Sequence, residues 1–444
     1  MMKDFEFGTG IIDKVLGELD KAKKYIRIVV FQIHIEEIIN KLKEKVKKGV
    51  SVEIITLPYE SIQENVREQV TKNLKELEKM GGIISLCDWN LGDTSHTKTV
   101  PGPWHNLHSK FMVTDKSAIV LSANLIGNDD IDAILINDDK IEINDFNKKF
   151  ESIKDDYIND NIFKKIKDKT ENKEDYEEII TPPAHLSKNQ KSILHYPLEL
   201  CPNMENFEEK LYVFPLDCRG RDFVKKVIED AREFIYISTE RFTDKELFYF
   251  LPKERLKGKE IKVLTKFQSQ DYQYEIIQFA KNCLSTDIGL KDNKSVHAKL
   301  IITDKLIALG SINLNQMNLG FIPKKGFWRS NTEVMLICKD KEIIKKAKRL
   351  FLEIFNNSED VIKNLVKKEV DNFKKIAKEV LGTPLYNCGE YLAVKYLKDE
   401  TRDRKKYLDI LIEASKLAKT KNLKKIKEDL IKEAENNLYN QKKL

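Results

Sequence analysis

The sequence predicts an α/β fold in which two homologous lobes are followed by a helical C-terminal extension. Three observations lead to this prediction: a short motif occurs twice, the same order of strands and helices surrounds both copies, and apolar residues recur at helical spacing near the C-terminus. We expect the two lobes to meet about a pseudo-twofold axis and to form one unit. The expected ranges are 1–154 for the first lobe, 155–204 for a charged, proline-containing linker, 205–358 for the second lobe and 359–444 for a basic helical region.

The two lobes are expected to share one order of elements. In the first lobe this order is a helix at 10–23, a strand at 25–31, a second helix, a strand at 49–56 and an amphipathic helix at about 61–80. In the second lobe it is a helix near 222–232, a strand at 233–237, a second helix, a strand at 258–265 and an amphipathic helix at about 272–282. A third short strand follows in each lobe. Strands that alternate with helices at this spacing predict largely parallel sheets with crossover helices.

The C-terminal region is predicted to be helical throughout. Apolar residues recur at helical spacing from Val361 to Leu381, and Gly382-Thr383-Pro384 ends this helix. Two further helices are expected, at 390–399 and from 404 to about 439.

The repeated motif is His-x-Lys, followed by Asp and then by Ser and Asn. Its first copy comprises His108, Lys110, Asp115, Ser122 and Asn124, and its second copy comprises His297, Lys299, Asp304, Ser311 and Asn313. In both copies three apolar residues and a Thr follow the Lys, which is typical of a buried strand. Because successive side chains on a strand alternate between its faces, His and Lys emerge on the same face.

Two imidazoles and two ammonium groups in one duplicated fold are suited to phosphodiester cleavage. One His can attack phosphorus while the other protonates the leaving oxygen, and the two Lys offset the charge of the equatorial oxygens. The motif therefore predicts a phosphodiesterase.

These residues resemble the HKD signature of the phospholipase D superfamily, and the resemblance covers roughly residues 8 to 355. It implies two phospholipase D-like lobes that form one pseudo-twofold catalytic unit, a phosphohistidine intermediate and no requirement for metal. The superfamily includes phospholipases, phosphatidyltransferases and several nucleases. The motif therefore indicates the reaction more firmly than the substrate.

The resemblance also suggests roles for the motif residues. His108 is the better candidate for the nucleophile and His297 for the general acid, although the sequence does not separate these roles. Lys110 and Lys299 are expected to contact the phosphate. Asp115 and Asp304 are expected to support neighbouring backbone or turn groups at the strand ends.

Short polar residues follow each motif strand, and we expect Ser122, Asn124, Ser311 and Asn313 to donate to phosphate oxygens, as similar positions in the family do. Gly310 is expected to let the backbone approach the ligand closely. Leu121 takes its place in the first copy, so we expect that lobe to line the pocket more tightly.

A catalytic imidazole needs a partner on its second nitrogen to fix the tautomer. In the family a Glu downstream of the motif commonly supplies this partner, and Glu333 directly precedes an apolar strand. Its equivalent in the first lobe is Asp132, which is shorter by one methylene. We expect both carboxylates to belong to the catalytic site.

An irregular segment from Asp88 to Asn106 precedes the first motif and contains glycine, proline and tryptophan. Loops of this length are often functional, so it is expected either to gate the substrate or to cover the junction of the lobes. His96 and His105 match no part of the family pattern and are interpreted as ordinary loop residues.

The composition describes a globular chain of 444 residues with six single cysteines and no Cys-x-x-Cys pair, so reduced thiols are expected. The N-terminus lacks a signal-peptide pattern and no apolar run could span a bilayer, so we expect a cytoplasmic protein without an integral membrane segment. The formal net charge is +6, and residues 361–444 hold 21 Lys and Arg against 13 Asp and Glu. This surplus favours nucleic acid as a partner, whereas the alternative is a solvated helical face or a surface for a protein partner.

The favoured function is a metal-independent phosphodiesterase that hydrolyses DNA or RNA through a phosphohistidine. The alternative is a phospholipase D or phosphatidyltransferase acting on phospholipids at a membrane surface, and a third class is a non-catalytic nucleic-acid-binding subunit. The sequence has no Walker loop, no Gly-x-Gly-x-x-Gly that opens a helix and no His-Glu-x-x-His motif. We therefore expect no cofactor and no metal ligands.

Overall fold

The computed structural model describes residues 3–57, 59, 62, 64–86, 107–126, 130–157, 207–214, 217–266, 273–320, 331–385, 388–399 and 404–441. The predicted irregular segment 88–106, with His96 and His105, lies outside the described residues. So does nearly all of the predicted linker 155–204.

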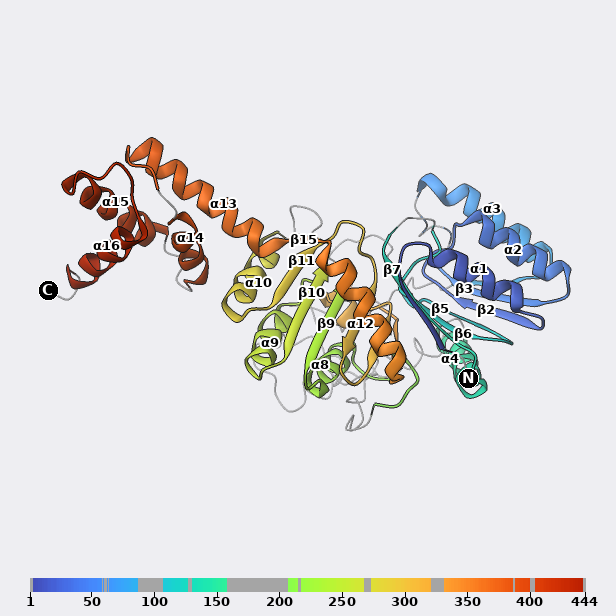
Figure 1. Ribbon diagram of the computed structural model, residues 1–444. Coiled ribbons are helices and arrows are strands. Elements are labelled where there is room, and N and C mark those ends of the chain that lie inside the picture. Colours follow the sequence, from blue (N-terminus) through green and yellow to red (C-terminus); the bar gives the residue numbers. More distant parts are fainter. Residues whose placement is uncertain are drawn as a thin grey trace, which may run out of the picture.

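The first lobe is built on one sheet with helices on both of its faces (Figure 1). Its elements are β1 (Lys3–Gly8), α1 (Ile11–Lys21), β2 (Tyr25–Val29), α2 (Glu36–Lys47), β3 (Ser51–Thr56), α3 (Glu64–Lys79), β4 (Ile83–Leu86), β5 (Phe111–Thr114), β6 (Ala118–Leu121), β7 (Asp132–Asn137) and α4 (Lys140–Tyr157). Among the described residues the sheet has seven strands in the order β1-β7-β6-β5-β2-β3-β4. The motif strand β5 is therefore central.

The second lobe repeats this arrangement. Its elements are β8 (Leu211–Phe214), α8 (Gly220–Asp230), β9 (Phe234–Thr239), α9 (Lys245–Leu256), β10 (Glu260–Thr265), α10 (Gln273–Thr286), β11 (Gly289–Asp292), β12 (Lys299–Thr303), β13 (Ile307–Gly310), α11 (Gln316–Leu319), β14 (Glu333–Cys338), α12 (Lys341–Asn356) and β15 (Glu359–Asp360). Within the described residues its sheet has eight strands in the order β15-β11-β10-β9-β12-β13-β14-β8. Apart from the added edge strand β15, the order matches that of the first lobe.

The prediction of largely parallel sheets is wrong. Among the described strands, only β2, β3 and β4 in the first sheet, and β9, β10 and β11 in the second, run parallel to one another. The other pairings are antiparallel, because tight turns such as the one at Asp115-Lys116 join β5 to β6 without a crossover helix. The edge strands β1 and β8 were not predicted from the sequence.

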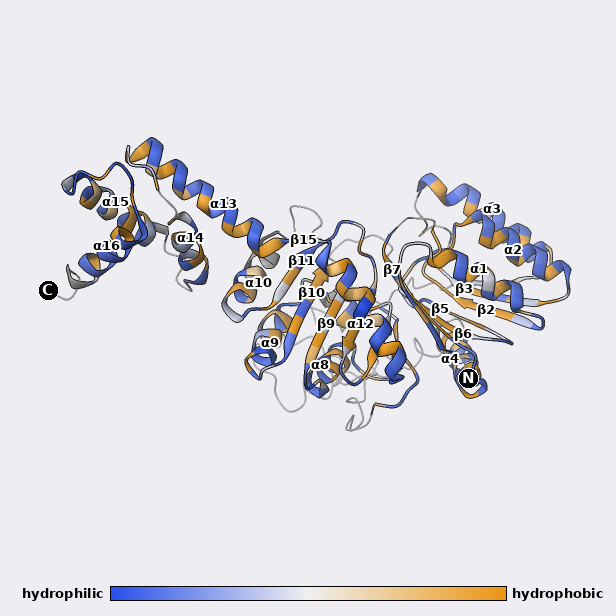
Figure 2. Cartoon of the chain, viewed as in Figure 1, coloured by the Kyte–Doolittle hydropathy of each residue, from blue (hydrophilic) through white to orange (hydrophobic). Residues whose placement is uncertain are grey.

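The two lobes share a central core. Buried residues of both sheets form one apolar cluster with α4 and α12, while α1, α2 and α3 cover the outer face of the first sheet and α8, α9 and α10 that of the second. Phe351 on α12 stacks on Phe7 of the first lobe, with ring centres 6.4 Å apart, and on Tyr236 of the second, at 5.2 Å. Figure 2 shows apolar strands between helices that expose polar residues. The lobes therefore pack as one body, as expected.

Helix α12 begins where the sequence allows a strong N-terminal cap. The Asp340 carboxylate accepts hydrogen bonds from the backbone N–H groups of Glu342 and Ile343, which have no partner within the helix. Its buried residues recur every three or four positions, as a helix that packs on a core requires. These residues are Ile343, Ile344, Ala347, Phe351 and Phe355.

The C-terminal region forms a separate helical unit that α13 joins to the second lobe (Figure 1). Its elements are α13 (Val361–Lys375), a π-helical turn (Ile376–Val380), α14 (Gly389–Lys398), α15 (Arg404–Thr420) and α16 (Glu428–Gln441). Val361 packs into the core of the second lobe, whereas Phe373 belongs to the apolar core of the C-terminal unit. Helix α13 thus spans the two.

One continuous helix from 404 to about 439 was predicted, and this is wrong. The chain breaks between α15 and α16 at Asn422, whose φ of 53° lies in the left-handed region. The segment is held by a hydrogen bond of 2.9 Å from the Ile426 backbone N–H to the Pro384 carbonyl. The left-handed Asn422 ends α15, where the Leu423 N–H donates to the Ala418 carbonyl over 2.8 Å, and the contact with Pro384 holds the segment that follows.

Candidate active site

The first imidazole is oriented by a carboxylate from the opposite lobe. His108 lies just before β5, and its Nδ1 is 2.9 Å from Oε1 of Glu333, the first residue of β14 in the second lobe. Glu333 is fully buried. A carboxylate at this distance accepts the Nδ1 proton, which leaves Nε2 of the neutral ring with its lone pair.

The second imidazole has the reciprocal arrangement. His297 lies just before β12, and its Nδ1 is 2.9 Å from Oδ1 of Asp132, the first residue of β7 in the first lobe. Asp132 is also buried. Burial opposes its ionisation, but hydrogen bonding and charge attraction from His297, together with Lys299 and Ser122, lower the pKa of Asp132.

In both pairs the carboxylate comes from the lobe opposite the histidine. Backbone hydrogen bonds between the lobes fix this arrangement. The His108 N–H donates to the carbonyl of Thr332, which precedes Glu333, over 2.9 Å, and the His297 N–H donates to that of Ile131, which precedes Asp132, over 2.9 Å. Each motif strand is thus aligned with the acid-bearing strand of the other lobe. The sequence predicted both carboxylates but did not reveal that they exchange lobes.

The two serines hold the carboxylates. Ser122 Oγ donates to Asp132 Oδ1 over 2.7 Å, and Ser311 Oγ donates to Glu333. Each hydroxyl also accepts a backbone N–H, from Ala133 at 2.8 Å and Val334 at 2.9 Å. A hydroxyl has one proton, and each serine already donates it to a carboxylate. The prediction that Ser122 and Ser311 donate to phosphate is therefore wrong.

The two asparagines of the motif differ in their contacts. Asn313 Oδ1 accepts the backbone N–H of Arg241 at 3.3 Å, which ties β13 to the segment after β9. Asn124 Oδ1 is buried without a hydrogen-bond partner among the described residues. Donation to phosphate from either side chain stays a prediction.

The glycine that precedes Ser311 serves packing. A Cβ added at Gly310 would lie 1.9 Å from the Val334 carbonyl oxygen, so the close approach is to strand β14 and not to a ligand. Leu121, its equivalent, is buried in the apolar core beneath α1 and α2. The expectation that these two positions shape the pocket is therefore wrong.

The motif aspartates lie at the far end of the motif strands. Asp115 Oδ1 accepts the backbone N–H groups of Lys23 and Lys24 at 2.8 and 3.1 Å. Asp304 Oδ1 accepts those of Arg232 and Glu233 at 2.8 and 3.1 Å. Asp115 therefore holds the turn that leads into β2, and Asp304 holds the turn that leads into β9. Both support the backbone, as expected, and neither contacts the histidines.

The two motif lysines are buried in the centre of the site. Lys110 is fully buried and donates to the His108 carbonyl oxygen over 2.7 Å. Burial and the charge of Lys299, opposed by Glu333, Glu240 and Asp132, lower the pKa of Lys110 to about 7. Burial also lowers the pKa of Lys299, against the attraction of Glu240, Asp132 and Glu333. Lys110 has no carboxylate within ion-pair distance and only one hydrogen bond among the described residues, whereas Lys299 lies 3.6 Å from Glu240 Oε2.

The geometry thus joins two imidazoles and two lysines in one buried centre, and the sequence matches a known family over the same regions. The family described as "Cardiolipin synthase, PLD-like domain" matches residues 15–154 and residues 224–355. The chain belongs to the phospholipase D superfamily. This confirms the resemblance seen in the motif and identifies a phosphodiesterase fold. No curated protein matches the chain in sequence.

Solved structures are similar to all or part of this chain, and the first of the two below shares its fold. Phosphatidylserine synthase from Haemophilus influenzae Rd KW20 aligns over 89% of this chain and 94% of its own, with 14% identity and a TM-score of 0.56. Nuc, a phospholipase D family member from Salmonella typhimurium, aligns over 34% of this chain and 95% of its own, with 17% identity and a TM-score of 0.29.

A polyphosphate kinase is also similar to part of the chain. The enzyme from Porphyromonas gingivalis aligns over 80% of this chain with 11% identity and a TM-score of 0.46. The aligned region spans half of that kinase's length, 50%.

Two residues beside the histidines were not predicted from the sequence. Asn318 on α11 donates to Glu333 and lies 3.3 Å from Nδ1 of His108. Glu240, one residue beyond β9, has Oε2 3.4 Å from Nε2 of His297 and 3.6 Å from Nζ of Lys299. Glu240 directly follows β9, the strand that pairs with the motif strand β12. This position at the end of a neighbouring strand could have pointed to Glu240 as a site residue.

Across the described residues, no three His, Cys, Asp or Glu side chains are arranged to hold a metal ion, and no helix is long and apolar enough to cross a bilayer.

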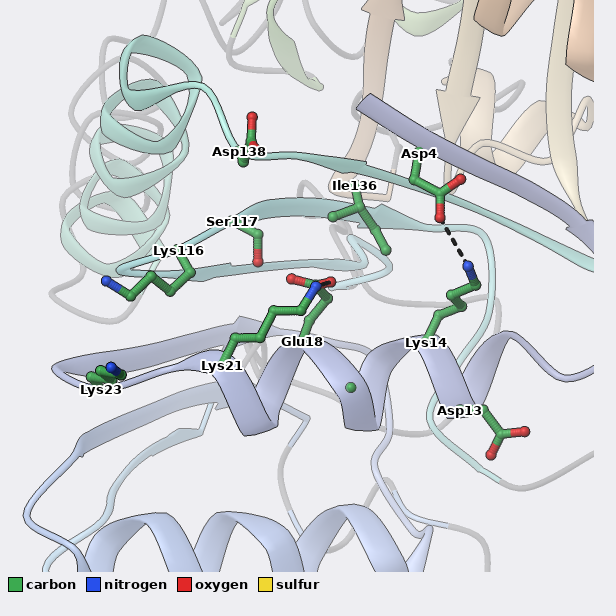
Figure 3. Close-up of a pocket in the computed structure, with 11 residues that line it drawn as sticks. Asp4, Asp13, Lys14, Glu18, Lys21, Lys23, Lys116, Ser117, Ile136 and Asp138 are labelled. Carbon is green, nitrogen blue, oxygen red and sulfur yellow. Dashed lines mark hydrogen bonds and ion pairs between the residues drawn. The ribbon is translucent and has the colours of Figure 1, made fainter. Parts of the chain in front are cut away.

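A cavity of about 630 Å³ lies in the first lobe between α1 and the ends of β1, β6 and β7 (Figure 3). Several of its charges pair with one another, for example Lys14 with Asp4 at 2.9 Å and Lys21 with Glu18 at 2.6 Å. None of the histidines lines it. We therefore assign the candidate active site to the His-Lys centre.

We predict that Lys110→Met abolishes activity without loss of stability. The substitution removes a buried ammonium group that has one hydrogen bond in the free protein, so the free energy of unfolding should stay the same or rise by about 1 kcal/mol. Chemical denaturation monitored by circular dichroism measures this change.

Lys45→Met is the matched control. Lys45 is also buried, but its ammonium donates to the carbonyls of Asp20 and Ala22 at 2.6 and 3.0 Å, at the end of α1. Its loss should cost about 2 kcal/mol because buried acceptors lose their donor. Equal destabilisation by both variants would mean that Lys110 stabilises the fold, contrary to the electrostatic argument.

Proposed function

We propose that this chain hydrolyses phosphodiester bonds of nucleic acid through a covalent phosphohistidine. The observation that carries the proposal is the pair of imidazoles, each with a carboxylate on Nδ1 at 2.9 Å and each beside a buried lysine. Such a pair supplies both a nucleophile and a proton donor for the same phosphate.

The reaction takes two steps in this proposal. In the first, Nε2 of one imidazole attacks phosphorus and forms a P–N bond, while the P–O bond to the leaving group breaks. The other imidazole, protonated, gives its Nε2 proton to the departing oxygen. In the second, that imidazole takes a proton from water, the water oxygen bonds to phosphorus and the P–N bond breaks. Both imidazoles then return to their starting protonation states.

The two lysines stabilise the charge that develops on phosphorus. Lys110 and Lys299 lie in a dry centre where an ammonium attracts an anion far more strongly than in water. Asp132 and Glu333 keep both rings aligned, and Ser122, Ser311 and Asn318 in turn hold these carboxylates. The chain's own cations thus take the part that metal ions play in two-metal nucleases.

The basic turn of the C-terminal unit supports nucleic acid as the substrate. Residues between the middle of α15 and the start of α16 expose a run of lysines: Lys416, Lys419, Lys421, Lys424, Lys425 and Lys427. Some of them pair with acidic side chains, such as Lys421 with Glu433 at 2.6 Å. A local excess of exposed lysine favours the backbone of a polyanion.

A phospholipid substrate is the second candidate. The observation that favours it is the alignment with a phosphatidylserine synthase, which covers 89% of this chain and 94% of that enzyme. A glycerophospholipid presents the same phosphodiester to the two imidazoles, so the active-site chemistry does not separate the substrates.

We predict that His108→Ala and His297→Ala each reduce turnover of a phosphodiester at least about 10³-fold, and that the double variant is hardly slower than either single one. The two rings act as one unit, and losses within such a unit are strongly non-additive. Steady-state rates of the three variants test this. A single variant with near-normal turnover would require a mechanism that uses one motif.

We expect EDTA to leave cleavage intact, because Lys110 and Lys299 provide the positive charge at the phosphate. The experiment incubates the pure protein and EDTA with DNA, RNA and phosphatidylcholine vesicles in parallel, and products are resolved by gel and by thin-layer chromatography. Loss of activity in EDTA that magnesium restores would contradict the phosphohistidine mechanism. Cleavage of the vesicles alone would replace nucleic acid by phospholipid as the substrate.

We expect the basic turn to strengthen nucleic-acid binding without a part in chemistry. Changing Lys419, Lys424 and Lys427 to Gln in the full chain should raise the dissociation constant for DNA or RNA about tenfold at low salt and flatten its salt dependence. Turnover at saturating substrate should not change. Fluorescence anisotropy across a salt series measures both quantities.

The control changes three exposed lysines of the first lobe, Lys47, Lys48 and Lys79, to Gln. It removes the same charge from another surface, so it should weaken binding less. Equal binding by both triple variants and the unchanged chain would make the C-terminal unit a packing or partner element.

A further inference from the structure

The pseudo-twofold relation of the lobes is broken beside the histidines where β2 and β9 end. Strands β2 and β9 pair with β5 and β12 in the same register, so each residue after β2 has an equivalent after β9. The Phe31 carbonyl accepts a hydrogen bond from Thr56 Oγ1 at 3.2 Å, and the Glu240 carbonyl accepts one from Thr265 Oγ1 at 3.5 Å. Phe31 and Glu240 therefore occupy the same place in the two lobes.

These two side chains give the histidines different surroundings. The Phe31 ring meets the His108 ring edge to face, with ring centres 5.4 Å apart. In the second lobe a carboxylate takes the place of that ring, and Glu240 Oε2 lies 3.4 Å from Nε2 of His297. His108 thus has one carboxylate contact, through Nδ1, and His297 has two, one at each nitrogen.

The first environment favours the neutral imidazole. Burial, together with the charges of Lys110 and Lys299, lowers the pKa of His108 to about 4 against the attraction of Glu333. At neutral pH its Nε2 lone pair is free to attack, because Glu333 accepts the proton on Nδ1.

The second environment places a second carboxylate beside the ring. Burial opposes ionisation of Glu240, but Lys299, His297, Arg241 and Lys266 outweigh it and lower the pKa of Glu240 to about 2. Glu240 is therefore ionised at every working pH. His297 lies between this carboxylate and that of Asp132, and the charge of Lys299, whose Nζ is 2.9 Å from Nε2, opposes them.

The family resemblance implies His108 as the nucleophile and His297 as the general acid. Building on these roles and on the proposed function, we propose that Glu240 attracts the proton on Nε2 of His297 and positions it for transfer to the leaving oxygen. Glu240 acts through His297 and is a positioning residue. In the first step the His108 Nε2–P bond forms, the bond from phosphorus to the leaving oxygen breaks, and the Nε2 proton of His297 passes to that oxygen. In the second step His297 recovers a proton from the attacking water as the P–N bond breaks.

Two diesters that differ in their leaving group test the role of Glu240. Diphenyl phosphate has a basic leaving group that needs a proton, whereas bis(4-nitrophenyl) phosphate has one that departs readily without it. The rate of the first burst of leaving group is measured from pH 5 to pH 10 for the wild-type protein and for Glu240→Gln, so that only the first step is observed.

With diphenyl phosphate, we expect Glu240→Gln to slow the burst about tenfold or more at pH 8 and to move the basic limb of the profile about one pH unit lower. Without the carboxylate, Nε2 of His297 loses the negative charge that attracts its proton. With bis(4-nitrophenyl) phosphate the variant should stay within about threefold of wild type. Glu240→Asp, which keeps the charge, should recover much of the basic limb.

Glu53→Gln is the matched control, because Glu53 has a similarly buried side chain and is paired with Arg27 and Lys154 at 3.2 and 2.9 Å, away from the histidines. It should leave both profiles unchanged. Acid-quenched samples, digested and analysed by mass spectrometry at alkaline pH, should carry the phosphoryl group on the peptide that contains His108.

The outcomes separate this inference from the proposed function. A wild-type protein that cleaves neither diester overturns both. If the wild-type protein cleaves both diesters but Glu240→Gln leaves the basic limb in place, or slows both diesters equally, Glu240 does not hold the proton of the general acid. Phosphate found on His297 overturns the assignment of roles.

Discussion

The exchange of carboxylates between the lobes is the constraint on which the rest of the site depends. Glu333 of the second lobe holds His108 of the first, and Asp132 of the first holds His297 of the second. Neither lobe alone contains an oriented imidazole. The backbone hydrogen bonds from His108 and His297 to the opposite lobe set these distances, so the site forms only when the lobes pack in one register.

The shared core makes this packing possible. Lys110, Lys299, Asp132 and Glu333 are all buried, and burying charges costs free energy that their mutual attraction only partly offsets. Helices α4 and α12 and the inner faces of both sheets bury a continuous apolar cluster around the junction. This apolar burial supplies the stabilisation that the charged centre lacks, and it also excludes water from the lysines that face the phosphate.

Duplication provides two equal halves, whereas the chemistry requires two unequal roles. The histidines, lysines, serines and backbone contacts follow the pseudo-twofold relation closely. Phe31 and Glu240 do not, and the shorter Asp132 also differs from its counterpart Glu333. A few substitutions around a symmetric frame are enough to give two identical side chains different electrostatic surroundings.

Much of this protein could be predicted from its sequence. The repeated His-x-Lys motif, followed by Asp, Ser and Asn, predicted the superfamily and the two-lobed α/β fold, and both are confirmed. Such predictions succeed because strand alternation and motif spacing are local properties. The antiparallel half of each sheet was missed, since the residues of a buried strand are alike in either direction.

Only the tertiary structure decided how the site residues meet. It showed that each carboxylate binds the histidine of the other lobe and that Ser122 and Ser311 donate their protons to those carboxylates. It also showed that Gly310 leaves room for strand β14. It also brought Glu240 and Asn318 to the histidines, although both lie outside the motif. These contacts join residues far apart in the chain, and a single sequence determines them only through the packing of the whole fold.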